Sequence, residues 1–141
     1  VGEEGFLMQL GTLSGNPVAC VAGLKTMEIL RRENLHKKMR EDGKRLKALF
    51  EKYLEPTGID YKILGDDTLF DVVFTNKNIK NYRDYISADS NLYQHFNASL
   101  RANGIFKPPG KVYVSSVLSS DDFILTENAI QSATNDICKL Q

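Results

Sequence analysis

The sequence predicts an α/β fold of the α+β type, in which helices pack on an open, mainly antiparallel sheet. Apolar residues recur at helical spacing in four segments, and three short runs are rich in β-branched and aromatic residues. In chain order the elements read α-α-β-β-α-β-α. With 141 residues, of which 42% are hydrophobic and 26% are charged, the chain is large enough to bury a core of its own.

The first helix is expected over residues 17–30. Ser14 or Asn16 can cap it, and Pro17 suits the first helical position, where an N–H group would have no partner within the helix. The segment is apolar on most of its faces. This composition predicts a buried helix rather than one that lies on the surface.

The second helix is expected to begin at a cap on Asn34 and to end near Leu54, where the letters EPTG stop it. One face is rich in lysine, arginine and glutamate and is expected to be solvated. The opposite face carries an apolar stripe made of Leu35, Met39, Leu46, Leu49, Phe50 and Tyr53.

Two antiparallel strands are expected next, at residues 61–65 and 69–75, with GDD as the turn between them. Because side chains alternate along a strand, Phe70, Val72 and Phe74 share one face of the second strand. The alternate residues, Asp71 among them, share the other face.

The third helix is expected at about residues 90–103, with Gly104 as its stop and an apolar stripe of Leu92, Phe96 and Leu100. A third strand is expected at residues 112–116. In the last helix Ser119 can act as the N-cap and Asp122 as its capping-box partner. The inner face of that helix is expected to comprise Phe123, Ile130, Ala133, Ile137 and Leu140.

The charge balance and the reactive side chains argue against several classes of function. The formal net charge is zero, which gives no support for binding nucleic acid or a membrane surface. Cys20 and Cys138 are expected to be buried, reduced thiols of a cytoplasmic protein, although the sequence leaves a disulfide between them open. No cluster of residues predicts a metal site. His36 and His95 are expected to be surface or half-buried helix residues, and the chain offers no self-contained catalytic set.

The pair Gly11–Thr12 is the strongest candidate for ligand binding. A glycine lets backbone amides approach a ligand closely, a threonine hydroxyl adds a donor, and a following helix N-terminus adds positive potential. These features suit a phosphate. A turn of small residues before a helix also has a purely structural interpretation, and the residues alone leave both open.

Four stretches carry a resemblance to a known family. QLGTLSGNPVACVAGLKTMEIL, LFDVVFTNKNIKNYRD, LYQHFNASLRANGIFKPP and YVSSVLSSDDF follow in order along the whole chain. Together they resemble the C-terminal portion of class III aminotransferases, which depend on pyridoxal 5'-phosphate (PLP). Within that family the pattern is most similar to the glutamate-1-semialdehyde 2,1-aminomutase branch.

The resemblance implies a cytoplasmic homodimer of PLP fold-type I in which PLP forms a Schiff base with a lysine of the large domain. Gly11 and Thr12 match the Gly-Thr pair that the family donates to the cofactor phosphate of the neighbouring subunit. Residues 1–16 would then be the phosphate-loop segment, and residues 17–141 the connecting helix and C-terminal small domain. The dimer contact would involve the Gly11–Thr12 loop and helix 17–30, and the substrate would be a small amino acid or amino-aldehyde.

The sequence departs from the family pattern in ways that bear on activity. The family lysine lies upstream of the Gly-Thr pair, whereas this chain has no lysine before Lys25 and is expected to be inactive by itself. PPGKVYVSS is about three residues shorter than the family segment and lacks its glutamate, while Leu118 and Met8 replace a histidine and a tyrosine. A different amine donor or acceptor is therefore open. The alternative is a non-catalytic structural or oligomerisation module without a ligand.

Overall fold

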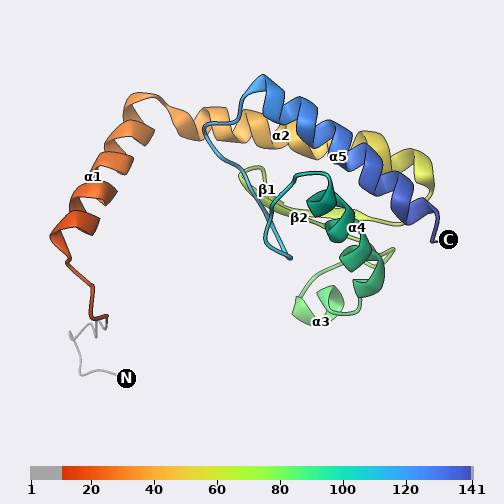
Figure 1. The fold of residues 1–141 in the computed structure, drawn as a ribbon. Coiled ribbons are helices and arrows are strands. Elements are labelled where there is room, and N and C mark those ends of the chain that lie inside the picture. Colours follow the sequence, from red (N-terminus) through yellow and green to blue (C-terminus); the bar gives the residue numbers. More distant parts are fainter. Residues whose placement is uncertain (1–10, 141) are drawn as a thin grey trace, which may run out of the picture. The chain divides into compact units, whose positions relative to one another are not determined.

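A computed structural model of the chain describes residues 11–140 (Figure 1). The chain divides into two compact units, which meet between Leu35 and His36. Unit 1 contains α1 (Pro17–Arg32), and α2 (Leu35–Leu54) begins at its end. The remaining elements are a 3₁₀ turn (Glu55–Thr57), β1 (Lys62–Asp66), β2 (Leu69–Val73), α3 (Tyr82–Tyr85), α4 (Ser90–Ala102), β3 (Val112–Tyr113) and α5 (Ser120–Cys138).

The sheet of unit 2 is three-stranded and antiparallel, in the order β1-β2-β3. In the first pair Ile63 lies opposite Val72, and in the second pair Phe70 lies opposite Val112. This sheet and the order of the larger elements confirm the predicted fold class. The difference is α3, a single turn inside a connection that the sequence predicted to be irregular.

Alternation along β2 builds the core of unit 2. Phe70, Val72 and Phe74, which were predicted to share one face, are buried, and three helices supply the side chains that cover them. The Phe50 ring of α2 lies 6.0 Å from that of Phe70, and the Phe96 ring of α4 lies 5.3 Å from that of Phe74. The helices α2 and α5 lie side by side, and the ion pair Lys52–Glu127 joins them at 2.6 Å (Figure 1). Unit 2 therefore consists of helices packed on a sheet.

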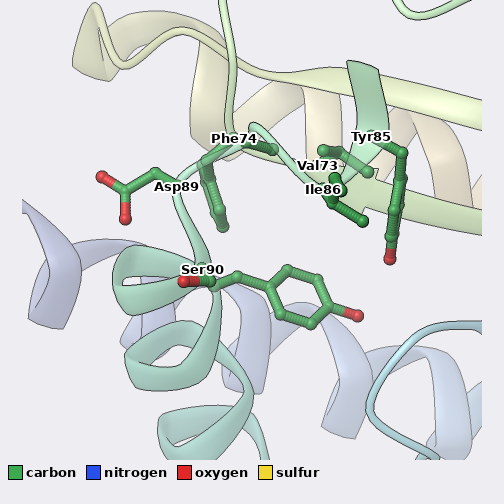
Figure 2. A pocket seen from close by; sticks show the side chains of 8 residues that line it. Val73, Phe74, Tyr85, Ile86, Asp89 and Ser90 are labelled. Atoms are coloured by element: carbon green, nitrogen blue, oxygen red, sulfur yellow. The ribbon is translucent and has the colours of Figure 1, made fainter. Parts of the chain in front are cut away.

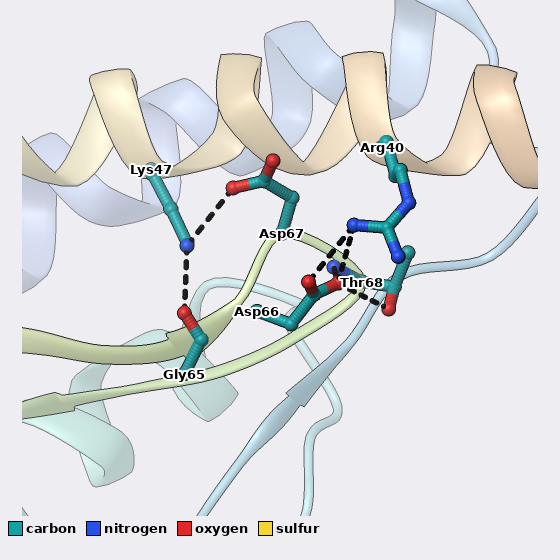
Figure 3. A network of polar contacts seen from close by, with 6 residues as sticks. All are labelled: Arg40, Lys47, Gly65, Asp66, Asp67 and Thr68. Carbon is teal, nitrogen blue, oxygen red and sulfur yellow. Dashed lines mark hydrogen bonds and ion pairs between the residues drawn. The ribbon is translucent and has the colours of Figure 1, made fainter.

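Polar contacts fasten the β1–β2 turn to α2 (Figure 3). The Arg40 guanidinium donates to both carboxylate oxygens of Asp66, at 3.1 and 2.8 Å. Lys47 Nζ donates to the Gly65 carbonyl and to Asp67, each at 3.0 Å. At Gly43 a Cβ atom would lie 1.8 Å from the Asp67 carbonyl oxygen, so only glycine allows α2 and the turn to approach this closely.

Local signals predicted the helix ends of unit 2 well. Ser119 and Asp122 form the predicted capping box of α5, in which the Ser119 amide donates to Asp122 Oδ2 at 2.8 Å. Gly104 follows the last turn of α4 with φ of +88°. On the inner face of α5, however, Leu140 is 54% exposed, because the helix already ends at Cys138. The other four predicted residues of that face are buried.

Two further expectations fail in the described chain. The third strand ends at Tyr113 rather than at residue 116, although the Val114 amide still donates to the Thr68 carbonyl at 3.1 Å. Cys20 and Cys138 are free but exposed rather than buried, because Cys20 lies in α1 and Cys138 is the last residue of α5. His36 and His95 are exposed residues of helices, as predicted.

The expected burial of the first helix is also wrong for this chain, since α1 contains no buried residue. A lone helix lacks a second layer, and within the described residues unit 1 supplies no sheet or full-length helix to pack on α1. The cap is as predicted, with Asn16 as the capping residue and Pro17 in the first turn. Among the described residues, no helix is long and apolar enough to cross a membrane.

Candidate functional site

The predicted phosphate-binding pair lies in a turn that leads directly into α1. The Ser14 amide donates to the Gly11 carbonyl at 3.0 Å, and the Asn16 amide donates to the Leu13 carbonyl at 3.1 Å. Gly15 has φ of +76°, a conformation that favours glycine. At Gly11 a Cβ atom would lie 2.5 Å from Ser14 Oγ, so a larger residue would force that side chain to move. Backbone conformation therefore explains Gly15, and the position of the Ser14 side chain explains Gly11.

The structure changes which donors the turn can offer. Asn16 Oδ1 accepts from the amides of Val18 and Ala19, at 3.0 and 3.1 Å. Two of the helix N-terminal amides that would attract an anion are thereby already occupied. Among the described residues, the amide and hydroxyl of Thr12 form no hydrogen bond, and the residue is exposed. Among the described residues, Thr12 thus combines an amide and a hydroxyl without hydrogen-bond partners, and the amides of Leu13 and Gly15 also have none.

This arrangement fits a phosphate group. The first turn of α1 contains no acidic residue that would repel a dianion. A threonine hydroxyl and a backbone amide are typical phosphate donors, and the adjoining helix terminus adds a favourable dipole even where its amides are capped. The turn can thus hold part of a phosphate, although the donors of this one segment are too few to enclose it.

A second cluster of polar residues lies in unit 2, around Asp71 on the side of β2 opposite Val72. Asp71 is only 7% exposed although it is an acid. The Tyr85 hydroxyl lies 3.0 Å from Asp71 Oδ2, the Tyr93 hydroxyl lies 3.0 Å from Oδ1, and the Val72 amide donates to Oδ1 at 3.0 Å. The sequence placed Asp71 on this face but did not single it out.

Burial dominates the ionisation of this cluster. It raises the pKa of Asp71, and the hydrogen bonds from Tyr85 and Tyr93 only partly oppose that effect. Burial and the neighbouring Asp71 raise the pKa of Tyr85 to about 12 and that of Tyr93 further still. Burial lowers the pKa of Lys107, whose ammonium group lies 5.4 Å from the centre of the Tyr93 ring.

A cavity of about 280 Å³ adjoins the cluster (Figure 2). Its walls are mostly apolar and include Val73, Phe74 and Ile86, together with the rings of Tyr85 and Tyr93. Figure 2 shows Val73, Phe74, Tyr85 and Ile86 around this space. The cavity contains neither a nucleophile paired with a base nor two facing carboxylates, so its lining residues do not form a hydrolytic site.

The other acidic residues that the sequence offered as candidates stabilise the fold. Asp66 and Asp67 bind the side chains of α2 from the strand turn, and Asp122 caps α5. Within residues 11–140, no group of three or more histidine, cysteine or acidic side chains could hold a metal ion. Met8 lies outside the described residues. The predicted pair Gly11–Thr12 and the Asp71 cluster belong to different units.

Comparison with known proteins relates the chain to aminomutases. The glutamate-1-semialdehyde 2,1-aminomutase of Methanopyrus kandleri is 31% identical over 136 residues, which are 94% of this chain and 32% of that protein. The enzyme of the same name from Methanosarcina acetivorans is 29% identical over 132 residues, or 92% of this chain and 31% of that protein. The chain thus spans about a third of the length of these relatives. No model of a protein family matches it.

Solved structures show the same fold. An omega-transaminase from Sphaerobacter thermophilus matches 93% of this chain with a TM-score of 0.80 and 23% identity, over 30% of its own length. A transaminase with PLP bound matches 95% of this chain with a TM-score of 0.75 and 19% identity, again over 30% of its length. The chain is therefore a relative of the C-terminal portion of glutamate-1-semialdehyde 2,1-aminomutases, and its fold recurs within PLP-dependent transaminases.

Proposed function

We propose that the chain is the C-terminal portion of a cytoplasmic class III aminotransferase or aminomutase that works as a homodimer with PLP. Its role is to place Gly11 and Thr12 against the cofactor phosphate of the neighbouring subunit. The observation that carries this proposal is the exposed Thr12, whose amide and hydroxyl have no hydrogen-bond partner among the described residues. The aminomutase relatives and the similar fold of a transaminase with PLP bound support the phosphate of PLP as the ligand of those donors.

When bound, PLP supplies the capacity to take up and release an amino group and to stabilise negative charge on the substrate carbon. The contribution of this chain is binding and orientation. Thr12 donates hydrogen bonds to the phosphate, Gly11 keeps the turn tight, and Asn16 fixes the start of α1 behind them. Residues 1–16 act as the phosphate-loop segment, and residues 17–141 act as the connecting helix and small domain.

The 141 residues alone are expected not to transaminate. They contain no lysine before Lys25, whereas the covalent lysine of the family precedes the Gly-Thr pair. Lys107 does not replace it, because its amine lies over the Tyr93 ring and donates to the Pro108 carbonyl. A small amino acid or amino-aldehyde is the proposed substrate class of the complete enzyme. Because the segment PPGKVYVSS is shorter than in the family, the amine donor and the amine acceptor of the complete enzyme are not specified.

Thr12 variants of the full-length protein test the phosphate role. Thr12→Val removes the hydroxyl but keeps the size of the side chain, and it should weaken PLP binding about tenfold, the effect of losing one hydrogen bond to a charged group. Thr12→Ser should retain most of the affinity. The dissociation constant follows from quenching of protein fluorescence by PLP.

Thr126→Val is the matched control, because the Thr126 hydroxyl bonds the Asp122 carbonyl within α5. It should leave PLP affinity unchanged. Equal affinity of Thr12→Val and the wild-type protein for PLP would contradict the proposed role of Thr12.

The exposed apolar residues of α1 favour a second candidate function, a structural or oligomerisation module with no ligand. Val18, Leu24 and Val21 are 78%, 69% and 66% exposed. A patch of this kind is typical of an interface. Light scattering and phosphate titration of the chain separate the two functions. Self-association without any response of the Thr12 amide to phosphate would favour the module, whereas a phosphate-dependent shift of that amide would favour the cofactor site.

A further inference from the structure

The Tyr93 hydroxyl faces more acceptors than it has hydrogens. It lies 3.0 Å from Asp71 Oδ1 and 2.5 Å from the Pro109 carbonyl oxygen. A phenol has one hydrogen to donate, so with an ionised Asp71 it can fully satisfy only one of these oxygens. The other short contact would then join two oxygen atoms with no hydrogen between them.

A proton on Asp71 resolves this conflict. A neutral carboxyl group donates from Oδ1 to the Tyr93 oxygen, and Tyr93 in turn donates to the Pro109 carbonyl. Oδ1 keeps a lone pair for the Val72 amide, and Oδ2 still accepts from Tyr85. Every short contact in the cluster then contains one hydrogen, and the chain of bonds reaches from β2 to the loop at residues 105–111.

The surroundings of Asp71 shift its ionisation towards the neutral form, relative to an aspartate in water. Burial penalises the carboxylate and raises the pKa of Asp71. The groups that face it are the hydroxyls of Tyr85 and Tyr93, the Val72 amide and the Lys107 ammonium, all of which favour ionisation but do not outweigh burial. A second cavity, of about 310 Å³, is lined by Asp71, Gly110 and Lys111 among others, which places the loop directly beside the carboxyl group.

We infer that Asp71, Tyr93 and the Pro109 carbonyl form a proton-dependent latch that fastens the loop at residues 105–111 to β2 while Asp71 holds a proton. When Asp71 releases that proton to solvent, Tyr93 turns its hydrogen to the carboxylate. The Pro109 carbonyl then loses its donor, and the loop loses this attachment. The three groups belong to unit 2, so the latch does not depend on the phosphate role of Thr12.

The sign of the pH effect follows from the direction of the pKa shift. Asp71 ionises at a higher pH in the folded chain than in the unfolded chain. Its contribution to stability is therefore complete below the ordinary aspartate range and is lost as the pH rises through the raised pKa. The loop should be held at low pH and released at higher pH.

The first test is an NMR titration of the unmodified chain. The Asp71 side-chain carboxyl carbon should titrate above the ordinary aspartate range, and the amides of Gly110 and Lys111 should shift with the same midpoint. After correction for intrinsic exchange, hydrogen exchange of those amides should become about three- to tenfold faster above it, the effect of losing one typical hydrogen bond. Titration of Asp71 in the ordinary range, or loop amides that ignore its midpoint, would overturn the latch.

Variants then separate the members of the latch. Tyr93→Phe should leave the loop amides in fast exchange at every pH, and Asp71→Asn should abolish their pH response. Tyr85→Phe is the matched control, because Tyr85 bonds Asp71 without reaching Pro109, and its loop amides should still follow the pH. An unchanged loop response in Tyr93→Phe would contradict the latch, whether or not Asp71 titrates as expected.

Discussion

Similar apolar side chains are exposed in unit 1 and buried in unit 2. In α1, Val18 and Leu24 are 78% and 69% exposed, whereas in α5 Ile130 and Ile137 are fully buried. Both helices have a sequence pattern that calls for burial, but only unit 2 contains a sheet and other helices to provide it. The buried core of unit 2 therefore provides most of the free energy of folding, while unit 1 exposes an apolar surface and the donors of Thr12. That division suits a segment that contributes to a site in another subunit.

The largest difference between the units should come from removing a large apolar side chain. Phe96 is buried among the rings of Phe50 and Phe74, and Phe96→Ala should lower the free energy of unfolding by about 3–5 kcal/mol. Leu24→Ala, at an exposed site in α1, should change it by less than about 0.5 kcal/mol. Urea unfolding followed by circular dichroism measures both values, and equal losses would show that α1 has a core of its own.

Glycine substitutions should have opposite signs in the two units. Gly43→Ala drives a Cβ atom into the Asp67 carbonyl and should cost about 1–3 kcal/mol. Gly23→Ala meets nothing within 4 Å and should raise the helix content of α1, because alanine is favoured over glycine in a helix by about 0.5–1 kcal/mol. Thermal unfolding and circular dichroism give the two results. A harmless Gly43→Ala would contradict the close approach of α2 and the strand turn.

Removal of a helix N-cap should have a smaller effect, which again differs between the two units. Ser119→Ala removes the capping box of α5 and should lower the free energy of unfolding of unit 2 by about 1 kcal/mol. Asn16→Ala removes the cap of α1 and should reduce helix content without moving the urea midpoint of unit 2. A shift of that midpoint by Asn16→Ala would mean that the two units unfold together.

The smallest effect concerns acid stability in unit 2. Hydrogen bonds from Thr68 and Arg40 lower the pKa of Asp66 from 3.8 to about 2. The stabilisation from its ionised form is complete above the unfolded value and is lost as the pH falls towards about 2. Asp66→Asn should therefore flatten the decline of stability between these pH values, as measured by urea midpoints. The pH dependence of the wild-type chain would persist in Asp66→Asn if other carboxyl groups carried it.

Sequence patterns predicted the features that depend on neighbouring residues. The alternation of Phe70, Val72 and Phe74 and the pairing of Ser119 with Asp122 are local, and the structure confirms both. An apolar helix at residues 17–30 was also correctly located, but its pattern indicates a need for burial and cannot say which surface provides it. Its burial within this chain was therefore predicted wrongly.

The Asp71 cluster could not be predicted because tertiary packing assembles it. Asp71, Tyr85, Tyr93 and Pro109 come from a strand, two helices and a loop. An acid within the apolar run LFDVVF was the available signal, since burial of an aspartate requires partners. In the turn at residues 11–17, the residue types indicated donors for an anion. The structure was needed to show that Asn16 occupies two helix amides, whereas the amide and hydroxyl of Thr12 have no hydrogen-bond partner among the described residues.

The most direct test of the central claim is complementation between two subunits of the full-length protein. One variant carries Thr12→Val, and the other lacks the lysine that binds the cofactor. If Thr12 acts across the dimer, a mixed dimer contains one site with both the lysine and Thr12. We predict that mixing restores one PLP site of wild-type affinity for each heterodimer. Mixed dimers that bind PLP no better than the Thr12→Val dimer would contradict the claim that this chain completes its neighbour's phosphate site.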